Sequence, residues 1–223
     1  MPITFKRFAA IDFETADYGR DSACSVSIVI AEKGKISEQK SFLIRPPRRD
    51  FIFSYLHGIY WEDVAKQPGF ADLWPKIKKH LDKVEFIAAH NASFDRGVLH
   101  ACCAMTGAVP PDVEYLCTMK LARRLWGVYP TKLSDVCRYF GIPLKHHDAK
   151  SDAIACAKIV LEALEKGIPA DSFLGKKLFA TKALRHEENK SLSSFVSWWL
   201  KDRKQWRAYR PYRRKLFLWC RKV

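Results

Sequence analysis

The chain has 223 residues, of which 48% are hydrophobic, and carries a formal net charge of +15. This length can bury one substantial core, so we expect one globular domain of roughly 150–200 residues with an appendage. No run approaches the ~18 apolar residues of a membrane span, and the N-terminus lacks the features of a secretory signal, which predicts a cytoplasmic, non-membrane protein.

The first part of the chain predicts three strands. Residues 6–14, 24–32 and 36–44 are rich in β-forming residues, and the last two runs are joined by a turn at Lys33-Gly34. The diproline at 46–47 ends this meander.

Helices and short strands follow in alternation. Short apolar strands are predicted at 84–89 and 114–117. Helices are predicted at 61–65, 70–81, about 94–105 with Ser93 as N-cap, 121–125, 133–140 and 152–164. Strands first and alternating elements afterwards favour an α/β layer structure built on a mixed sheet.

The C-terminal end differs in composition from the rest. Residues 167–223 hold 15 Lys and Arg against four Asp and Glu, and their aromatic residues are interleaved with the basic ones. We expect a domain over 1–168 and a basic, aromatic-rich helical extension over 169–223, with a helix at 191–200. The extension is expected to contact a phosphate backbone. A solvated tail, a partner-docking segment and a helix packed on the domain are the alternatives.

Seven cysteines are present, and none stands in a C-x-x-C pair. Most lie among small apolar residues, where a thiol behaves as a small hydrophobe. A reduced compartment therefore fits better than a disulfide framework or a structural zinc site.

Two carboxylates stand near the end of the first predicted strand, in the stretch FAAIDFETAD over residues 8–17. Alternate strand residues share a face, so Asp12 and Glu14 point one way while Ile11 and Phe13 point the other. A divalent cation between the two carboxylates would turn their repulsion into a ligand pair. For an isolated D-x-E, however, a solvent-exposed strand end is the more common explanation.

Two further polar stretches open predicted helices. HNASFD, over 90–95, places Asp95 in a first helical turn, where the helix dipole favours an anion. HHDAKSDA, over 146–153, places Asp152 at the head of a buried helix, five residues after His147. Each alone is explained by helix-start chemistry or a surface histidine. Together, four carboxylates and one histidine are expected to meet at one edge of an α/β layer.

The motifs D-x-E, H-N-A-x-F-D and H-x-A-x-x-D-A occur here in the order of the three exonuclease motifs. Over roughly residues 5–166 the chain resembles the DnaQ-like DEDDh 3′→5′ exonucleases, the group that includes the proofreading epsilon subunit of bacterial DNA polymerase III. The resemblance implies a ribonuclease H-like fold, with a mixed five-stranded sheet flanked by helices. Softer matches are HGI at 57–59 and CTMKLAR at 117–123.

The resemblance also implies roles for particular residues. The metal ligands would be Asp12, Glu14, Asp95 and Asp152, holding two divalent cations, Mg²⁺ or Mn²⁺. His147, which keeps the H-x-x-x-x-D spacing that His146 does not, would be the general base. The nucleotide pocket would involve Phe13, Thr15, His57, Gly58, Ile59, Asn91 and Phe94. Each of these pocket residues is equally compatible with packing or turn chemistry, and a core-facing Phe13 would leave only backbone to reach the ligand.

We therefore expect a metal-dependent 3′→5′ exonuclease that releases 5′-mononucleotides from the 3′ end of single-stranded or frayed DNA by a two-metal mechanism. One alternative is RNA trimming of the oligoribonuclease type. Another is a non-catalytic nucleic-acid-binding partner of a polymerase. All five expected polar positions are filled, which favours the enzyme. Proofreading, DNA repair and oligonucleotide turnover stay open, as does a polymerase or other protein partner.

Overall fold

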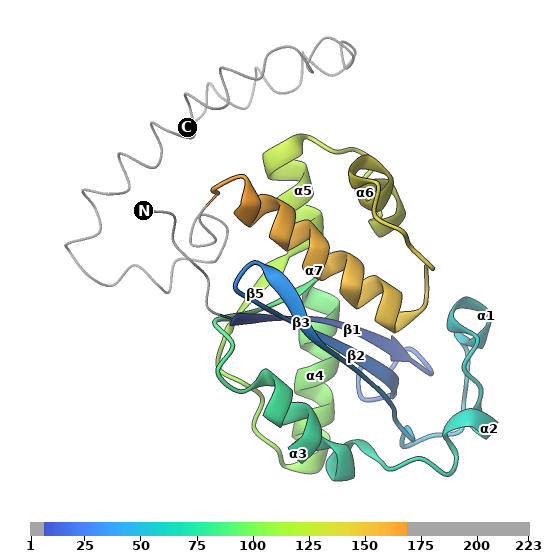
Figure 1. Cartoon of the computed structure of the whole chain (residues 1–223). Helices are drawn as coiled ribbons and strands as arrows, with labels where there is room; N and C mark the ends of the chain where they lie inside the picture. Colours follow the sequence, from blue (N-terminus) through green and yellow to red (C-terminus); the bar gives the residue numbers. More distant parts are fainter. Residues whose placement is uncertain (1–6, 169–223) are drawn as a thin grey trace, which may run out of the picture. The chain divides into compact units, whose positions relative to one another are not determined.

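The computed structural model describes residues 7–168 and is built on a five-stranded mixed sheet (Figure 1). The spatial order of the strands is β3-β2-β1-β4-β5. The first three strands form an antiparallel meander, and β4 and β5 extend it in parallel with β1. The predicted mixed sheet is therefore confirmed. The strands are β1 (Arg7–Thr15), β2 (Ala23–Glu32), β3 (Lys35–Leu43), β4 (Phe86–Ala89) and β5 (Glu114–Cys117).

Burial along the strands follows their place in the sheet. β2 is buried at every position but its last, because helices or neighbouring elements cover both of its faces. β3 is the edge strand and has no fully buried residue, which suits its polar sequence KISEQKSFL. The turn between them uses Lys33 and Gly34, both with positive φ (49° and 78°), as the twist of a two-residue hairpin requires.

Helices cover the two faces of the sheet. In Figure 1, α7 crosses one face with α5 and α6 beyond it, while α3 and α4 lie on the opposite side. The helices are α1 (Ser54–His57), α2 (Trp61–Val64), α3 (Phe70–Leu81), α4 (Ser93–Thr106), α5 (Thr118–Trp126), α6 (Leu133–Phe140) and α7 (Ala149–Glu165).

The small residues of α7 let it approach the sheet closely. Ala153, Cys156, Ala157 and Val160 are all buried, and the helix packs against β1 and β2. A close approach fixes the height of the helix above the sheet, and so fixes where its first turn lies relative to the end of β1.

Three predicted helix starts were displaced and one element was not predicted: α5 and α7 each begin three residues sooner than predicted, and α4 begins one residue sooner. Ser93 is the first residue of α4 rather than its N-cap, and its hydroxyl donates to Oδ1 of Asn91 at 3.1 Å. The left-handed φ of Asn91, 64°, turns the chain early enough for the helix to begin one residue sooner. α1 was not predicted: it is as short as α2 but lacks the acidic residues that mark the first turn of α2.

The six cysteines in the described part of the chain are free thiols, and five of them are buried, as expected for small hydrophobic residues. None of the helices between residues 7 and 168 combines the length and apolar composition needed to cross a bilayer. The basic extension predicted over 169–223, including the helix at 191–200, lies outside the described residues.

Candidate active site

The four predicted carboxylates come from three elements that meet at one edge of the sheet. Asp12 and Glu14 lie near the end of β1, while Asp95 and Asp152 lie in the first turns of α4 and α7. The backbone amide of Phe13 donates to Oδ1 of Asp95 at 3.1 Å. This buried hydrogen bond fixes the start of α4 against the strand that carries the other two carboxylates.

The alternation predicted for β1 is present. Ile11 and Phe13 are buried in the hydrophobic core, with exposed fractions of 1% and 4%. Asp12 and Glu14 point to the other face and keep a solvent-accessible edge. Asp95 and Asp152 are buried. The structure therefore presents two half-buried carboxylates with two fully buried ones beside them.

Burial raises the pKa of each of these four carboxyl groups, and repulsion from neighbouring carboxylates adds to the rise at Asp12 and Glu14. Burial is the main reason that the pKa of Asp12 lies well above its usual value, and the charges of Asp95, Asp152 and Glu14 raise it further. The pKa of Glu14 is raised to about 8 by burial and then by Asp152 and Asp95. Burial raises the pKa of Asp95 to about 7, although the amide of Phe13 opposes the shift. Without a counter-ion, this group of carboxyls therefore retains protons near neutral pH.

The first turn of α7 orients Asp152. Asp148 caps the helix by accepting a hydrogen bond from the amide of Ser151 at 3.0 Å. Oδ2 of Asp152 lies 3.3 Å from both the backbone amide of His147 and Nδ1 of His146. Within residues 7–168, Oδ1 of Asp152 is buried and has no hydrogen-bond partner. An orphaned buried carboxylate oxygen is costly, so it marks a position where a ligand would be favourable.

The two adjacent histidines stack on each other, with ring centroids 4.0 Å apart. His147 has a left-handed φ of 64°, so the backbone turns sharply at this residue just before α7. Burial and then His146 lower its pKa, so its imidazole is neutral at pH 7. Sequence spacing singled out His147, yet His146 is the imidazole that contacts Asp152. That contact was missed because spacing admits only one histidine per motif.

His57 joins the predicted nucleotide pocket to β1. Its Nε2 lies 3.2 Å from the carbonyl oxygen of Thr15, and its Nδ1 lies 3.0 Å from the amide of Ile59. The amide can only donate and the carbonyl can only accept, so the ring carries its proton on Nε2. Gly58 takes the left-handed conformation, with φ of 71°, that turns the chain between His57 and Ile59. Thr15, His57, Gly58 and Ile59 are thus brought together beside the carboxylates.

The other predicted pocket residues, Phe13, Asn91 and Phe94, differ in how far their side chains are exposed to solvent. The Phe13 side chain is in the core, so only its backbone faces the carboxylates. Asn91 is exposed, and Phe94 is partly buried against the core. The guanidinium of Arg20 lies 5.8 Å from the centroid of the Phe94 ring.

Two arginines hold the loop over residues 16–22, which follows β1. Arg48 donates to both carboxylate oxygens of Asp17 and of Asp21, at 2.6–3.2 Å. These hydrogen bonds lower the pKa of both aspartates. Arg20, on the loop itself, donates to the carbonyl oxygens of Ser93 and Phe94 in α4. Sequence analysis did not single out either arginine, because no local pattern links residues so far apart.

The carboxylates have the chemistry of a divalent-cation site, but their side chains are not closed around one. In the part of the chain that the structure describes, no group of three or more His, Cys, Asp and Glu side chains is arranged to hold a metal ion.

Comparison with known proteins gives consistent matches. The RNase_T exonuclease family model matches residues 9–160. Exodeoxyribonuclease 10 of Escherichia coli (strain K12) is 34% identical over 165 residues, which cover 69% of this chain and 67% of that protein. The 3′-5′ exonuclease DinG of Bacillus subtilis (strain 168) is 32% identical over 169 residues, or 72% of this chain, but the chain spans only 18% of DinG.

A solved structure of exonuclease X in complex with 5′ overhanging duplex DNA has a TM-score of 0.60 and 28% identity. The match covers 71% of this chain and 92% of that one. The ribonuclease H-like fold implied by the three motifs is thereby confirmed.

Proposed function

Because this chain belongs to the DnaQ-like 3′→5′ exonuclease family, we propose that it hydrolyses DNA from the 3′ end and releases 5′-mononucleotides. The observation that carries the proposal is the convergence of Asp12, Glu14, Asp95 and Asp152 at one sheet edge with raised pKa values. DNA is favoured over RNA because the relative matched over two thirds of its length is an exodeoxyribonuclease.

The residues present fit a divalent-cation cofactor. All four are hard oxygen donors of the kind that Mg²⁺ and Mn²⁺ prefer. The orphaned Oδ1 of Asp152 offers a lone pair with no competing hydrogen bond among the described residues. Asp12 and Glu14 keep an accessible edge through which an ion can enter. The raised pKa values also mean that a cation would replace bound protons rather than an existing salt bridge.

We propose that these four carboxylates hold two cations, with Asp12 shared between them. When bound, the cations would lower the pKa of the attacking water and neutralise charge on the leaving 3′-oxygen. Glu14 and Asp152 are assigned to the water side and Asp95 to the leaving-group side. The amide of Phe13 keeps the Asp95 carboxylate oriented throughout.

His147 is proposed as the general base. Its lowered pKa keeps the imidazole neutral at pH 7, so one ring nitrogen is free to accept a proton from water. Its own amide is directed at Asp152, which places the ring at the margin of the carboxylate group. His146, stacked on it, restricts the orientations that the His147 ring can adopt.

The terminal nucleotide is proposed to bind beside His57. The hydrogen bonds from His57 to Thr15 and from Ile59 to His57 give this wall of the pocket a fixed shape. Asn91, which precedes α4, and Phe94, in its first turn, are proposed to line the same pocket. The extension over 169–223 is proposed to contact the phosphate backbone, on the basis of its charge and aromatic content.

The test is a polarity assay on the full chain. Single-stranded DNA, duplex DNA and RNA, each labelled at the 5′ end, are incubated with Mg²⁺ or Mn²⁺, and the products are resolved at single-nucleotide spacing. A ladder that shortens from the 3′ end, with 5′-mononucleotides released, is expected on DNA. The same reaction with Asp12→Asn should show no ladder. Immediate release of a labelled mononucleotide, or equal activity of the variant, would overturn the proposal.

A further inference from the structure

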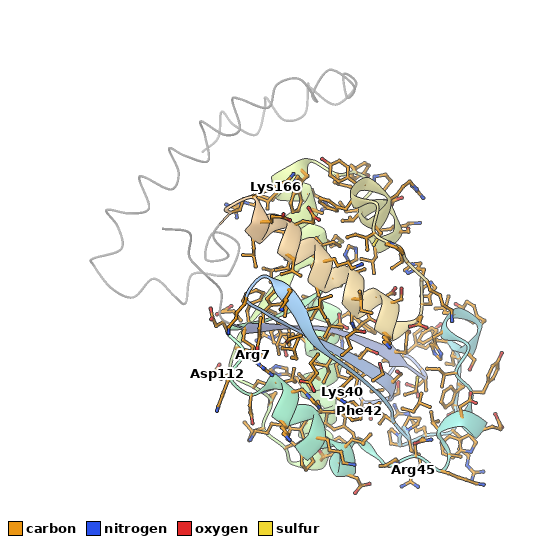
Figure 2. All side chains as sticks on the ribbon, in the orientation of Figure 1. Arg7, Lys40, Phe42, Arg45, Asp112 and Lys166 are labelled. Atoms are coloured by element: carbon orange, nitrogen blue, oxygen red, sulfur yellow. The ribbon has the colours of Figure 1, made fainter. Side chains whose placement is uncertain are left out.

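A groove that sequence analysis did not identify lies away from the carboxylates. It has a volume of about 690 Å³ and lies between the loop that follows β3, α2 and the first turn of α3. Figure 2 labels Arg45, which stands at the start of that loop. The groove is lined by Arg45, Pro46, Pro47, Arg49, Trp61 and Phe70, together with residues of α3 and the end of α4.

The charge available in this groove is positive. Across residues 7–168, neither Arg45 nor Arg49 lies within ion-pair distance of a carboxylate, whereas Arg48 between them is fully engaged. The carboxylate of Asp72 also lines the groove; it accepts from the amide of Gly69 but keeps its negative charge. The two guanidinium groups outweigh it, so the groove keeps a net positive charge that can meet an anion.

The groove has a fixed shape. The amide of Arg45 donates to the carbonyl of Pro68 at 3.0 Å, which holds the loop against the start of α3. The guanidinium of Arg49 lies 5.1 Å from the centroid of the Trp61 ring. Stacking of this kind holds the planar guanidinium while leaving its edge donors free, which suits recognition of a phosphate.

Strand register places this groove on the same edge of the sheet as the carboxylates. Glu14 is paired with Ser25, and Ser25 with Leu43, two residues before Arg45. Two inter-strand spacings and two residues along the chain put the backbone of Arg45 on the order of 10–15 Å from that of Glu14. At ~3.4 Å for each stacked nucleotide, about three or four nucleotides span that distance.

One continuous segment, residues 45–61, forms a wall of both places. Its two ends supply Arg45, Arg49 and Trp61 to the groove. Its middle supplies His57, which contacts Thr15, and Phe53, whose amide donates to the carbonyl of Ala16. The carboxylates point to the α7 side of the sheet and the groove lies on the α3 side, so a strand that follows this segment passes round the sheet edge into the groove.

We propose that the groove binds the phosphodiester backbone of the same DNA strand, a few nucleotides 5′ of the end held at the carboxylates. This inference rests on the proposed function, because it assumes that a 3′ end occupies the active site. Arg45 and Arg49 neutralise phosphates, and the Trp61 ring supports Arg49. The groove makes the enzyme favour substrates long enough to reach it.

The test measures binding in EDTA, so that it does not depend on hydrolysis. The full chain is compared with an Arg45→Gln/Arg49→Gln variant, using oligothymidylates of three and twelve nucleotides in a fluorescence anisotropy competition. A matched control is Lys35→Gln/Lys40→Gln on β3, which removes the same charge; Figure 2 shows Lys40 away from Arg45. We expect about a ten-fold loss of affinity for the 12-mer and less than about two-fold for the trimer. The dependence of log K on log salt should lose a slope of about 1.4, or 0.7 for each phosphate.

Three outcomes would overturn the groove proposal. They are an unchanged 12-mer affinity, an equal loss on both lengths, and an equal loss in the lysine control. If the unaltered chain binds the 12-mer as expected but releases no mononucleotide with Mg²⁺ or Mn²⁺, the proposed function fails while the groove stands.

Discussion

The backbone amide of Phe13 and the carboxylate of Asp95, 82 residues apart in sequence, are joined by a buried hydrogen bond of 3.1 Å. The two residues belong to β1 and α4, so the bond fixes the distance between the carboxylates that these elements carry. It also explains how a buried Asp95 can be kept without a basic partner, because the amide opposes the rise of its pKa.

Replacing Asp95 by Asn removes the negative charge of the side chain while keeping its position. The amide oxygen of Asn can still accept from Phe13, so the fold and the melting temperature should change little. Loss of the charge should lower hydrolysis on the order of 100-fold or more, since a cation site contributes several kcal/mol. The measurements are the rate of hydrolysis with Mn²⁺ and the affinity for Mn²⁺ by calorimetry. Asp112→Asn, at an exposed position, is the control and should be neutral; near-normal activity of the Asp95 variant would contradict the assignment.

The stability of the metal-free protein should depend on pH through Glu14. Its pKa is about 8 in the folded state against 4.5 ordinarily, so between these values the folded state binds more protons than the unfolded state. Stability from this group is therefore lost as the pH rises from about 4.5 to 8. Asp95 acts in the same direction, from 3.8 to about 7. Melting temperatures in EDTA should fall over this range in the native chain, and fall less in Glu14→Gln.

Addition of Mg²⁺ or Mn²⁺ should reverse that trend. A cation competes with protons for the same carboxylates, so stabilisation should be larger at pH 8 than at pH 5. Calorimetric titration in buffers of different ionisation enthalpy should detect released protons. Binding without proton release at pH 7 would contradict the raised pKa values of Glu14 and Asp95.

The two stacked histidines should differ sharply when replaced. His147→Ala removes the proposed base and should lower kcat by 10²–10⁴-fold, a typical range for general-base catalysis, at nearly unchanged oligonucleotide affinity. His146→Ala removes only the contact with Asp152 and the stacking partner, so we expect a loss of about ten-fold or less. Single-turnover rates measure both. A greater loss of rate for His146→Ala than for His147→Ala would assign the general base to His146 instead.

Much of this site was predictable from local pattern, and the remainder was not. Strand alternation placed Asp12 and Glu14 together opposite Phe13, and the small residues of α7 predicted a buried helix that carries Asp152. The links made by Arg48 were not predictable, since Asp17 and Asp21 lie 31 and 27 residues away and meet it only through the path of the folded chain. The start of α4 was displaced for a similar reason, because a left-handed residue before it, rather than a capping side chain, sets the boundary.

Arg48 should matter for both stability and substrate binding. Arg48→Met removes the guanidinium group that pairs with the carboxylates of Asp17 and Asp21 in the loop that follows β1. Because the Arg48 side chain is 40% exposed, screening limits the expected loss to about 1–2 kcal/mol of the free energy of unfolding. Two uncompensated negative charges near the strand should also raise KM more than they lower kcat. Arg138→Met, which breaks a pair with a 78% exposed arginine, is the control and should cost less than about 0.5 kcal/mol.

Gly97 leaves room for the Arg20 side chain on α4, and a Cβ at position 97 would overlap the guanidinium group. Gly97→Ala gains about 1 kcal/mol in helix propensity, which offsets the loss of exposed hydrogen bonds from Arg20 to Ser93 and Phe94, so the melting temperature should hardly change. The loop after β1 would nevertheless lose its attachment to the helix that carries Asp95, and kcat/KM should fall several-fold. Arg20→Met removes the same attachment without adding a methyl group, so the double variant should be no worse than either single one. Additive losses in that cycle would show that Gly97 and Arg20 act separately, and that the glycine is needed for another reason.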